Sequence, residues 1–389
     1  MRPTALPCAR PAAWWHTAAV LAALALAPAA HAMSPPCAAT PIYAHRGHPA
    51  HVENSAAAVR AATRDGFAGA EIDVQRLAGT DNWALHHDLL PGRVVALPAD
   101  RPLPLLTPAE WTGARFVDVR RGADEGPALL ERALAALPTE RPPGWRLLIE
   151  VKDFPSLDAI RALVRQVQRH VPLSSVTFAS LSSETLGYLR LALPPGSALA
   201  WVLLDPRAAP SALSPREWQL VDAHGERFGA SRAAIERVLR SGARLVADPP
   251  QVQRAATALG PGMSLVVDLE TLARTPALAE QARAAGVALT VYTLLGNSDD
   301  LARLLARLHH SRGFWPDAIV AGVAPAALCE AVLAHGEQLR AQIGAGGGAT
   351  ANAAPAASAG PVQQDRAPAP SAAPSAALPA PSAPHRFRW

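Results

Sequence analysis

The chain has 389 residues, and its 36 basic and 32 acidic side chains give a formal charge of only +4. Such a small excess of positive charge argues against a protein that binds nucleic acid along a basic stripe. Half of the residues are hydrophobic, which excludes a wholly disordered chain, and no apolar run reaches the roughly 18 residues of a membrane span.

The first 32 residues have the three parts of a secretory signal peptide. Arg2 and Arg10 give a positive start, residues 18–27 form a short apolar stretch, and Ala30 to Ala32 offer the small residues of a cleavage site. We therefore expect cleavage after Ala32 and a mature protein in the periplasm or outside the cell. The alternative is an N-terminal membrane anchor, for which the apolar stretch is short.

Residues 33–343 alternate short β-branched runs with longer helical patterns. The eight predicted strands span 41–45, 70–74, 146–151, 175–179, 198–204, 264–269, 287–293 and 317–321. Predicted helices between them include 54–64, 127–137, 156–170 and 182–193. Eight strands separated by helices favour right-handed crossovers and a closed (β/α)8 TIM-type barrel. A doubly wound sheet is the alternative, but its usual GxGxxG after the first strand is absent.

Two connections are longer than the barrel requires. Residues 89–126 follow the second strand, and residues 205–262 follow the fifth and contain a predicted helix pair at 215–223 and 231–240. Insertions after barrel strands lie at the face that carries the active site, so both are expected to shape the substrate pocket.

The ends of the folded region and the tail give two further expectations. Cys37 and Cys329 lie at opposite ends of a barrel whose ends meet, so they either form a disulfide in an oxidising compartment or remain two small unpaired hydrophobic residues. Residues 344–389 are almost all Ala, Pro, Gly and Ser. This composition predicts a disordered tail, since it offers too little apolar surface to offset the entropy of ordering.

Acidic residues stand on predicted strands where a barrel interior should be apolar. Glu71 and Asp73 are two residues apart and share one face of their strand, and Glu150 lies on the next strand. Buried carboxylates repel each other and lose hydration, so a cation is expected between them. Oxygen ligands favour Ca²⁺ or Mg²⁺ over Zn²⁺. Solvated strand ends or ion pairs with arginines would be the alternative.

Basic residues accompany these acids. Lys152 shares a strand face with Glu150 and is the only lysine beside 35 arginines, so we interpret it as neutralising a substrate anion. His45 ends the first strand, and His87 follows the second as part of a His-His-Asp run. Two imidazoles beside an anion suit general acid–base chemistry. Arg46 can donate two hydrogen bonds to a phosphate, and Gly47 lets the backbone pass close to a ligand.

In order and spacing, these residues resemble the glycerophosphodiester phosphodiesterase family. The resemblance lies in Tyr43-Ala44-His45-Arg46-Gly47, Glu53-Asn54-Ser55, Glu71-Ile72-Asp73-Val74, His87-Asp88 and Glu150-Val151-Lys152, with weaker matches at 127–131, 291–293 and 317–320. It covers roughly residues 42–328. It implies a (β/α)8 barrel, a divalent cation and cleavage of small-molecule glycerophosphodiesters to glycerol 3-phosphate and an alcohol.

The resemblance also implies roles for single residues. His45 would be the general base and His87 the general acid; Glu71, Asp73 and Glu150 would bind Ca²⁺ or Mg²⁺; Arg46 and Lys152 would contact phosphoryl oxygens. Tyr292 would contact substrate at a position where the family usually has Trp. Glu53 and Asn54 are expected to fix their loop and cap the first helix.

Two other functions stay open from the sequence. A related barrel phosphodiesterase that acts on lipids, phospholipase D-like or sphingomyelinase D-like, would use similar residues and need an exposed apolar rim. Its candidate rim residues are Leu103, Leu105, Leu106 and Trp111. The second is a non-catalytic envelope protein that keeps the barrel.

Overall fold

The computed structural model describes residues 36–79, 81–98, 101–118, 125–204, 213–228, 230–248, 250–292 and 298–346. The predicted signal peptide lies outside these residues and stays a prediction. The predicted tail also lies outside them, except for residues 344–346, which end the last helix.

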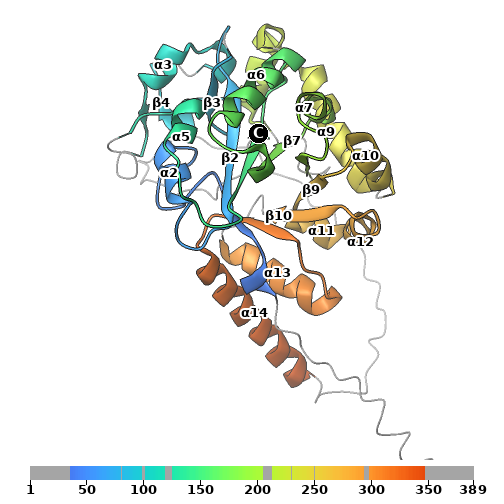
Figure 1. The fold of residues 1–389 in the computed structure, drawn as a ribbon. Coiled ribbons are helices and arrows are strands. Elements are labelled where there is room, and N and C mark those ends of the chain that lie inside the picture. Colours follow the sequence, from blue (N-terminus) through green and yellow to red (C-terminus); the bar gives the residue numbers. More distant parts are fainter. Residues whose placement is uncertain are drawn as a thin grey trace, which may run out of the picture. The chain divides into compact units, whose positions relative to one another are not determined.

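Eight parallel strands close into a barrel (Figure 1). They are β1 (Ile42–Ala44), β2 (Gly69–Arg76), β6 (Arg146–Val151), β7 (Val176–Ser180), β8 (Ala198–Leu203), β9 (Met263–Asp268), β10 (Ala288–Tyr292) and β11 (Ala318–Ala321). Each strand pairs with the next in this order, and β1 pairs with both β2 and β11. The predicted TIM-type barrel is therefore confirmed, and each strand boundary lies within two residues of its predicted position.

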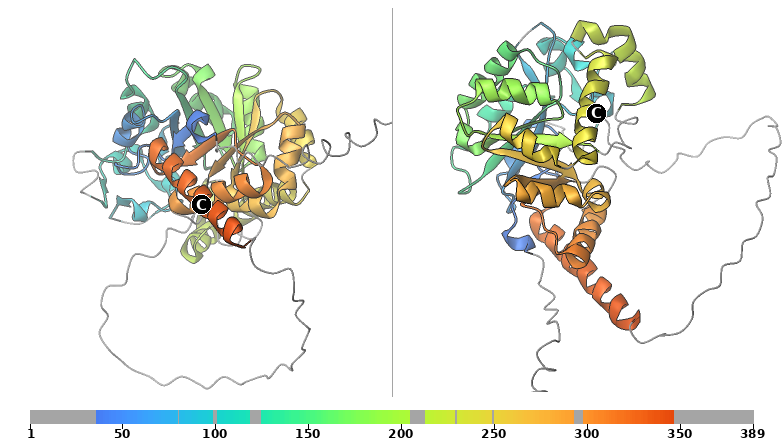
Figure 2. Two further views of the ribbon diagram at one scale, coloured as in Figure 1. Left: turned by 90° about the horizontal axis from the view of Figure 1, so that it is seen from below. Right: turned by 90° about the vertical axis from the view of Figure 1, so that its right-hand side faces the viewer.

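Helices surround the barrel, as two further views show (Figure 2). They are α2 (Ala56–Ala61), α5 (Leu130–Ala135), α6 (Leu157–Gln168), α7 (Ser183–Ala192), α8 (Pro215–His224), α9 (Arg232–Ala247), α10 (Gln251–Leu259), α11 (Leu269–Arg274), α12 (Ala277–Ala284), α13 (Ser298–Arg312) and α14 (Pro325–Gly346). Short 3-10 turns are η1 (Cys37–Ala39), η2 (Pro91–Arg93), η3 (Leu103–Leu105), η4 (Leu173–Ser175) and η6 (Gly225–Phe228). Within the described residues, every helix is too short or too polar to cross a lipid bilayer.

Strand alternation divides the core into two layers. On β6, Leu147 and Ile149 pack outward with the helices, in the same large cluster as Ile160 of α6. Leu148, between them, packs inside the barrel with Val202. Because successive side chains point to opposite faces of a strand, Glu150 must point to the same side as Leu148, toward the barrel interior.

The insertion after β2 forms a small lobe with its own core. Its elements are β3 (Trp83–Leu85), β4 (Val95–Ala96), α3 (Pro108–Thr112) and β5 (Arg115–Phe116). Leu103, Leu106 and Trp111 are at most 1% exposed and pack together there, and the Trp111 indole donates to the Ala128 carbonyl. These three candidates for an exposed rim are therefore not exposed, because the lobe needs them as its hydrophobic core. Leu105 is half-buried against the barrel-interior cluster.

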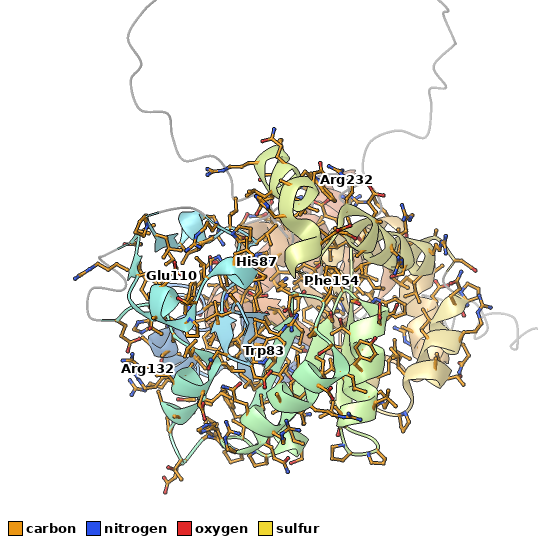
Figure 3. All side chains as sticks on the ribbon, turned by 90° about the horizontal axis from the view of Figure 1, so that it is seen from above. Trp83, His87, Glu110, Arg132, Phe154 and Arg232 are labelled. Carbon is orange, nitrogen blue, oxygen red and sulfur yellow. A yellow bond between two sulfur atoms is a disulfide. The ribbon has the colours of Figure 1, made fainter. Side chains whose placement is uncertain are left out.

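The insertion after β8 contains the predicted helix pair, α8 and α9. Val221 of α8 and Val238 of α9 belong to the same buried cluster as Val202 and Val266 of the barrel interior, so this pair helps to cover the interior. Figure 3, a view from above, places His87 between the β2 insertion, marked by Glu110, and α9, marked by Arg232.

A disulfide joins Cys37 of η1 to Cys329 of α14, with the two Cα atoms 5.6 Å apart. The first of the two sequence hypotheses is therefore confirmed. The reason is the closure of the barrel: η1 precedes β1, α14 follows β11, and β1 and β11 are neighbours in the sheet.

Candidate active site

The predicted site residues converge on one cavity inside the barrel. His45, Glu71, Asp73, His87, Glu150 and Tyr292 line it together with the apolar Leu148, Ala179, Val202, Val266 and Val320. The register of the sheet explains the convergence of the acids, since β2 and β6 pair so that Asp73 lies beside Glu150. Residues of the first three strands thus meet although more than 100 positions of sequence separate His45 from Glu150.

Three carboxylates form the charged centre of this cavity. Glu71, Asp73 and Glu150 each offer an oxygen within 4.8 Å of the other two, and no second group of this kind occurs in the described part of the chain. Burial, together with the charges of Asp73 and Glu150, raises the pKa of Glu71 well above its ordinary value. A cation between the three acids would favour their ionised forms, and their hard oxygen donors fit a divalent one.

Two basic side chains neutralise part of this charge. The Lys152 ammonium is buried, 2.8 Å from Glu150 Oε1 and 3.3 Å from Asp73 Oδ1. The Arg46 guanidinium lies with its Nε 3.7 Å from Asp73 Oδ2. Although burial acts to raise it, the pKa of Asp73 is lowered by these cations, so this carboxylate is ionised.

Asn54 and Ser55 have different roles: Ser55 caps α2, and Asn54 contacts Asp73. Ser55 is the N-cap of α2 and accepts from the Ala58 backbone N–H, so the prediction that Asn54 caps this helix was wrong. Asn54 instead adopts a positive φ of 55°, donates to Asp73 Oδ2 at 2.9 Å and accepts from the Asp73 backbone N–H at 3.0 Å. Asn54 therefore orients one of the three carboxylates by hydrogen bonds to its residue.

The turn after β1 brings Arg46 to the acids. Arg46 has a φ of 55°, and its backbone N–H donates to Glu71 Oε2 at 2.8 Å. Gly47 follows with a φ of 84°, and a Cβ at this position would lie 2.7 Å from the Ala58 side chain. Only glycine fits, but the reason differs from the expected one, since the backbone passes close to α2.

The two histidines occupy different settings. The His45 backbone N–H donates to Ala321 of β11, and burial, followed by the charge of Arg46, lowers the pKa of the His45 ring to about 3. His87 Nδ1 lies 2.8 Å from Asp88 Oδ1, and burial with the nearby Arg46 and Lys152 lowers its pKa well below the ordinary value. Because the Asp88 side-chain oxygen accepts, this contact favours the His87 tautomer with its proton on Nδ1.

His86 and Tyr292 are buried near the site but have no assigned role in proton transfer or metal binding. His86 is buried, contacts the Leu90 carbonyl and packs against Trp111, and unlike His87 it does not line the cavity. The Tyr292 hydroxyl donates to the Leu203 carbonyl at 3.4 Å, and burial raises the pKa of its phenol well above the ordinary value. Tyr292 is therefore a neutral part of the cavity wall.

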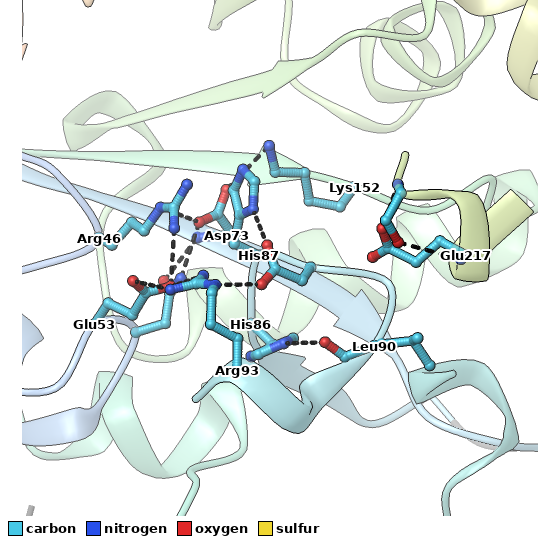
Figure 4. A network of polar contacts seen from close by, with 12 residues as sticks. Arg46, Glu53, Asp73, His86, His87, Leu90, Arg93, Lys152 and Glu217 are labelled. Atoms are coloured by element: carbon cyan, nitrogen blue, oxygen red, sulfur yellow. Dashed lines mark hydrogen bonds and ion pairs between the residues drawn. The ribbon is translucent and has the colours of Figure 1, made fainter. Parts of the chain in front are cut away.

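Sequence reasoning missed two polar residues that hold the site. Gln75 donates to the carbonyl oxygens of His86, His87 and Asp88 at 2.8–3.2 Å. Its position continues the inward alternation of Glu71 and Asp73, and this signal could have revealed it. Arg93 donates to Asp88 and to Glu53, beside which Figure 4 shows it, and lies in a proline-rich insertion whose sequence gives no such signal.

The sequence matches no family model and no curated protein. Among solved structures, the chain is similar to a candidate glycerophosphoryl diester phosphodiesterase from Agrobacterium tumefaciens str. C58, at 17% identity and a TM-score of 0.51 over 77% of this chain and 99% of the other. It is also similar to a glycerophosphodiester phosphodiesterase from Parabacteroides distasonis ATCC 8503, at 17% identity and a TM-score of 0.50 over 78% and 98%. The chain thus has the barrel fold of these proteins, as the resemblance of its first-half motifs implied.

Proposed function

We propose that the protein hydrolyses glycerophosphodiesters to glycerol 3-phosphate and an alcohol, using a divalent cation, Ca²⁺ or Mg²⁺. The observation that carries this proposal is the convergence of two histidines and three carboxylates on one buried cavity. The fold shared with solved phosphodiesterases supports the substrate class.

Glu71, Asp73 and Glu150 would hold the cation. The pKa values of Glu71 and Glu150 are raised, so positive charge between the three carboxylates would stabilise their ionised forms. When bound, the cation would supply charge that offsets the negative charge developing on the phosphate. Arg46 would add a hydrogen bond to a phosphoryl oxygen. Its buried Nε has no hydrogen-bond partner among the described residues, and Asp73 is too far away to accept from it. The Lys152 ammonium would contact a second phosphoryl oxygen.

The two histidines would transfer the protons. His45 is neutral at physiological pH, as a general base must be, and would take a proton from water or from the substrate's own glycerol hydroxyl. His87 would protonate the leaving alkoxide, with Asp88 fixing its ring and stabilising its charged form. The negative charge of a bound phosphodiester favours the protonated form of His87. Each such transfer is worth about 10²–10⁴-fold in rate.

A substrate panel tests the function directly. Glycerophosphocholine, glycerophosphoethanolamine and glycerophosphoglycerol are each incubated with the protein, and glycerol 3-phosphate is measured by an enzyme-coupled assay. We expect release that EDTA abolishes and that Ca²⁺ or Mg²⁺ restores. Absence of release from every diester under all metal conditions would reject the proposal and would favour the non-catalytic envelope protein.

The lipid-acting alternative requires an exposed apolar rim, and three of its candidate rim residues, Leu103, Leu106 and Trp111, are buried. Lysophospholipid vesicles in the same assay distinguish it: we expect slower release from them than from water-soluble diesters.

We also propose that residues 1–32 are a cleaved signal, that residues 33–343 form the catalytic domain and that the tail, predicted to begin at residue 344, is disordered beyond the end of α14 at Gly346. The disulfide supports export, since disulfides persist in oxidising compartments. N-terminal sequencing of the protein from the periplasm or medium should begin at Met33, and an intact N-terminus in the membrane fraction would contradict export.

A further inference from the structure

Arg93 holds two acids at once. It ends η2, in the insertion after β2, and its Nε donates to Asp88 Oδ2 at 2.6 Å. Its Nη1 and Nη2 donate to the two oxygens of Glu53 at 2.9 and 2.5 Å. All three nitrogens of the guanidinium therefore donate to protein carboxylates, as Figure 4 shows.

One of these acids touches a residue of the proposed chemistry. Asp88 uses its other oxygen, Oδ1, for His87 Nδ1 at 2.8 Å, and its side chain is 4% exposed. The plane of the Asp88 carboxylate is thus defined by His87 on one side and Arg93 on the other. Without Arg93, a buried carboxylate would lose half of its anchoring and would be free to rotate away from the imidazole.

The other acid anchors Arg93 itself. Glu53 accepts both Nη donors of Arg93, and its Oε1 also accepts from Arg46 Nη1 at 2.9 Å. A planar fork that binds one carboxylate with two nitrogens and a second carboxylate with the third cannot be reproduced by the single nitrogen of lysine. Glu53 therefore orients the Arg93 guanidinium, and the guanidinium in turn orients the Asp88 carboxylate.

We propose that Arg93 is a positioning residue that fixes the imidazole of His87 through Asp88, so that His87 can donate its proton to the leaving alkoxide. The proton donation by His87 rests on the proposed function. The fixing of the His87 ring by Asp88 and Arg93 rests on the contacts alone. It deepens that function by adding a residue that touches neither substrate nor cation.

Leaving-group dependence separates a positioning role from general damage. A choline alkoxide needs a proton to depart, whereas 4-nitrophenolate departs without one. Arg93→Ala should therefore slow kcat for glycerophosphocholine by about tenfold or more, the usual cost of losing an outer-shell partner, and leave kcat for glycerophospho-4-nitrophenol nearly unchanged. His87→Ala should show the same selectivity with a larger loss.

Two further variants make the result interpretable. Arg93→Lys keeps the charge and should keep the thermal stability, yet it should not restore kcat for the choline diester. Arg101→Ala is the matched control, because Arg101 lies in the same insertion and pairs with an exposed carboxylate, that of Glu110. This control should behave as wild type with both substrates.

An equal loss of kcat with both diesters in a folded Arg93→Ala protein would overturn the proposal, and so would wild-type kcat with the choline diester. If the wild-type enzyme cleaves neither diester, the proposed function fails, and nitrogen NMR of the histidine rings decides on Arg93. Arg93→Ala should then shift the His87 ring signals, assigned with His87→Gln, and Arg101→Ala should not. Unchanged His87 signals would reject the positioning role.

Discussion

The two halves of the barrel wall differ sharply in chemistry. The side formed by β1, β2 and β6, with the segment that follows β3, carries the two histidines, the carboxylates and the lysine of the site. The side formed by β7, β8, β9 and β11 contributes Ala179, Val202, Val266 and Val320, and β10 adds only the neutral Tyr292. Both halves have the same strand geometry, so the contrast arises from side chains alone.

This asymmetry has a physical consequence. An apolar wall keeps the local dielectric low, which strengthens each interaction between the charged half and a phosphate. It also raises the cost of leaving those charges uncompensated, as the displaced pKa values of Glu71 and Glu150 indicate. The charged half would perform the chemistry, and the apolar half would set the environment in which it occurs.

The largest effect should come from the histidines of the charged half. His45→Ala and His87→Ala should each lower turnover at least about 100-fold, because each removes one proton transfer. Steady-state rates with glycerophosphocholine measure this, and circular dichroism should show an intact fold. His310→Ala, an exposed histidine on α13, is the matched control and should retain full activity. Wild-type turnover in His45→Ala would show that the acid–base assignment is wrong.

A smaller loss is expected one contact further out. Asn54→Ala removes both hydrogen bonds that orient Asp73, and outer-shell losses of this kind typically cost about 10–100-fold in metal affinity or activity. Titrating Ca²⁺ or Mg²⁺ into the activity assay measures the metal midpoint. An unchanged midpoint would mean that Asp73 does not depend on Asn54 for its orientation.

The cation should stabilise the protein more as the pH rises. Because the pKa of Glu71 is raised above its ordinary value of 4.5, the metal-free folded state binds more protons than the unfolded state above that pH, and its stability falls as the pH rises toward the folded pKa. A cation replaces those protons. Thermal unfolding with and without metal should show a larger metal-induced rise in Tm at pH 8 than at pH 5, and Glu71→Gln should reduce this difference. A pH-independent rise would contradict the site.

The smallest effect should come from the apolar half. Tyr292→Phe removes a long hydrogen bond to Leu203 and should cost about 1 kcal/mol or less in stability, with turnover changed only a few-fold. Chemical denaturation and steady-state rates measure both. A loss of turnover as large as that of His87→Ala would show that the apolar half also takes part in the chemistry.

The sequence was sufficient for what depends on local periodicity. Strand spacing predicted the barrel, and the i, i+2 alternation of Glu71 and Asp73 predicted acids that point inward. It failed where tertiary contacts decide. Hydrophobicity alone does not separate a buried lobe core from an exposed rim, so Trp111 was misplaced. Asn54 and Ser55 are both good capping residues, and only the positive φ of Asn54 assigns the cap to Ser55.

Contacts between residues far apart in the chain also could not be predicted from the sequence. Arg93 and Glu53 are 40 residues apart and meet only because the β2 insertion folds back toward the turn after β1. With 35 arginines in the chain, no pattern marks this one.

The single lysine gives the protein an unusual experimental property. Reductive methylation with isotope-labelled formaldehyde modifies amines only, so it would label Lys152 and the N-terminal α-amine and nothing else. Because the Lys152 ammonium lies between Glu150 and Asp73, its methyl resonance would report on the carboxylate centre without any engineered tag. Because Lys152 is buried, the rate of labelling would also measure how often this side chain becomes accessible to solvent.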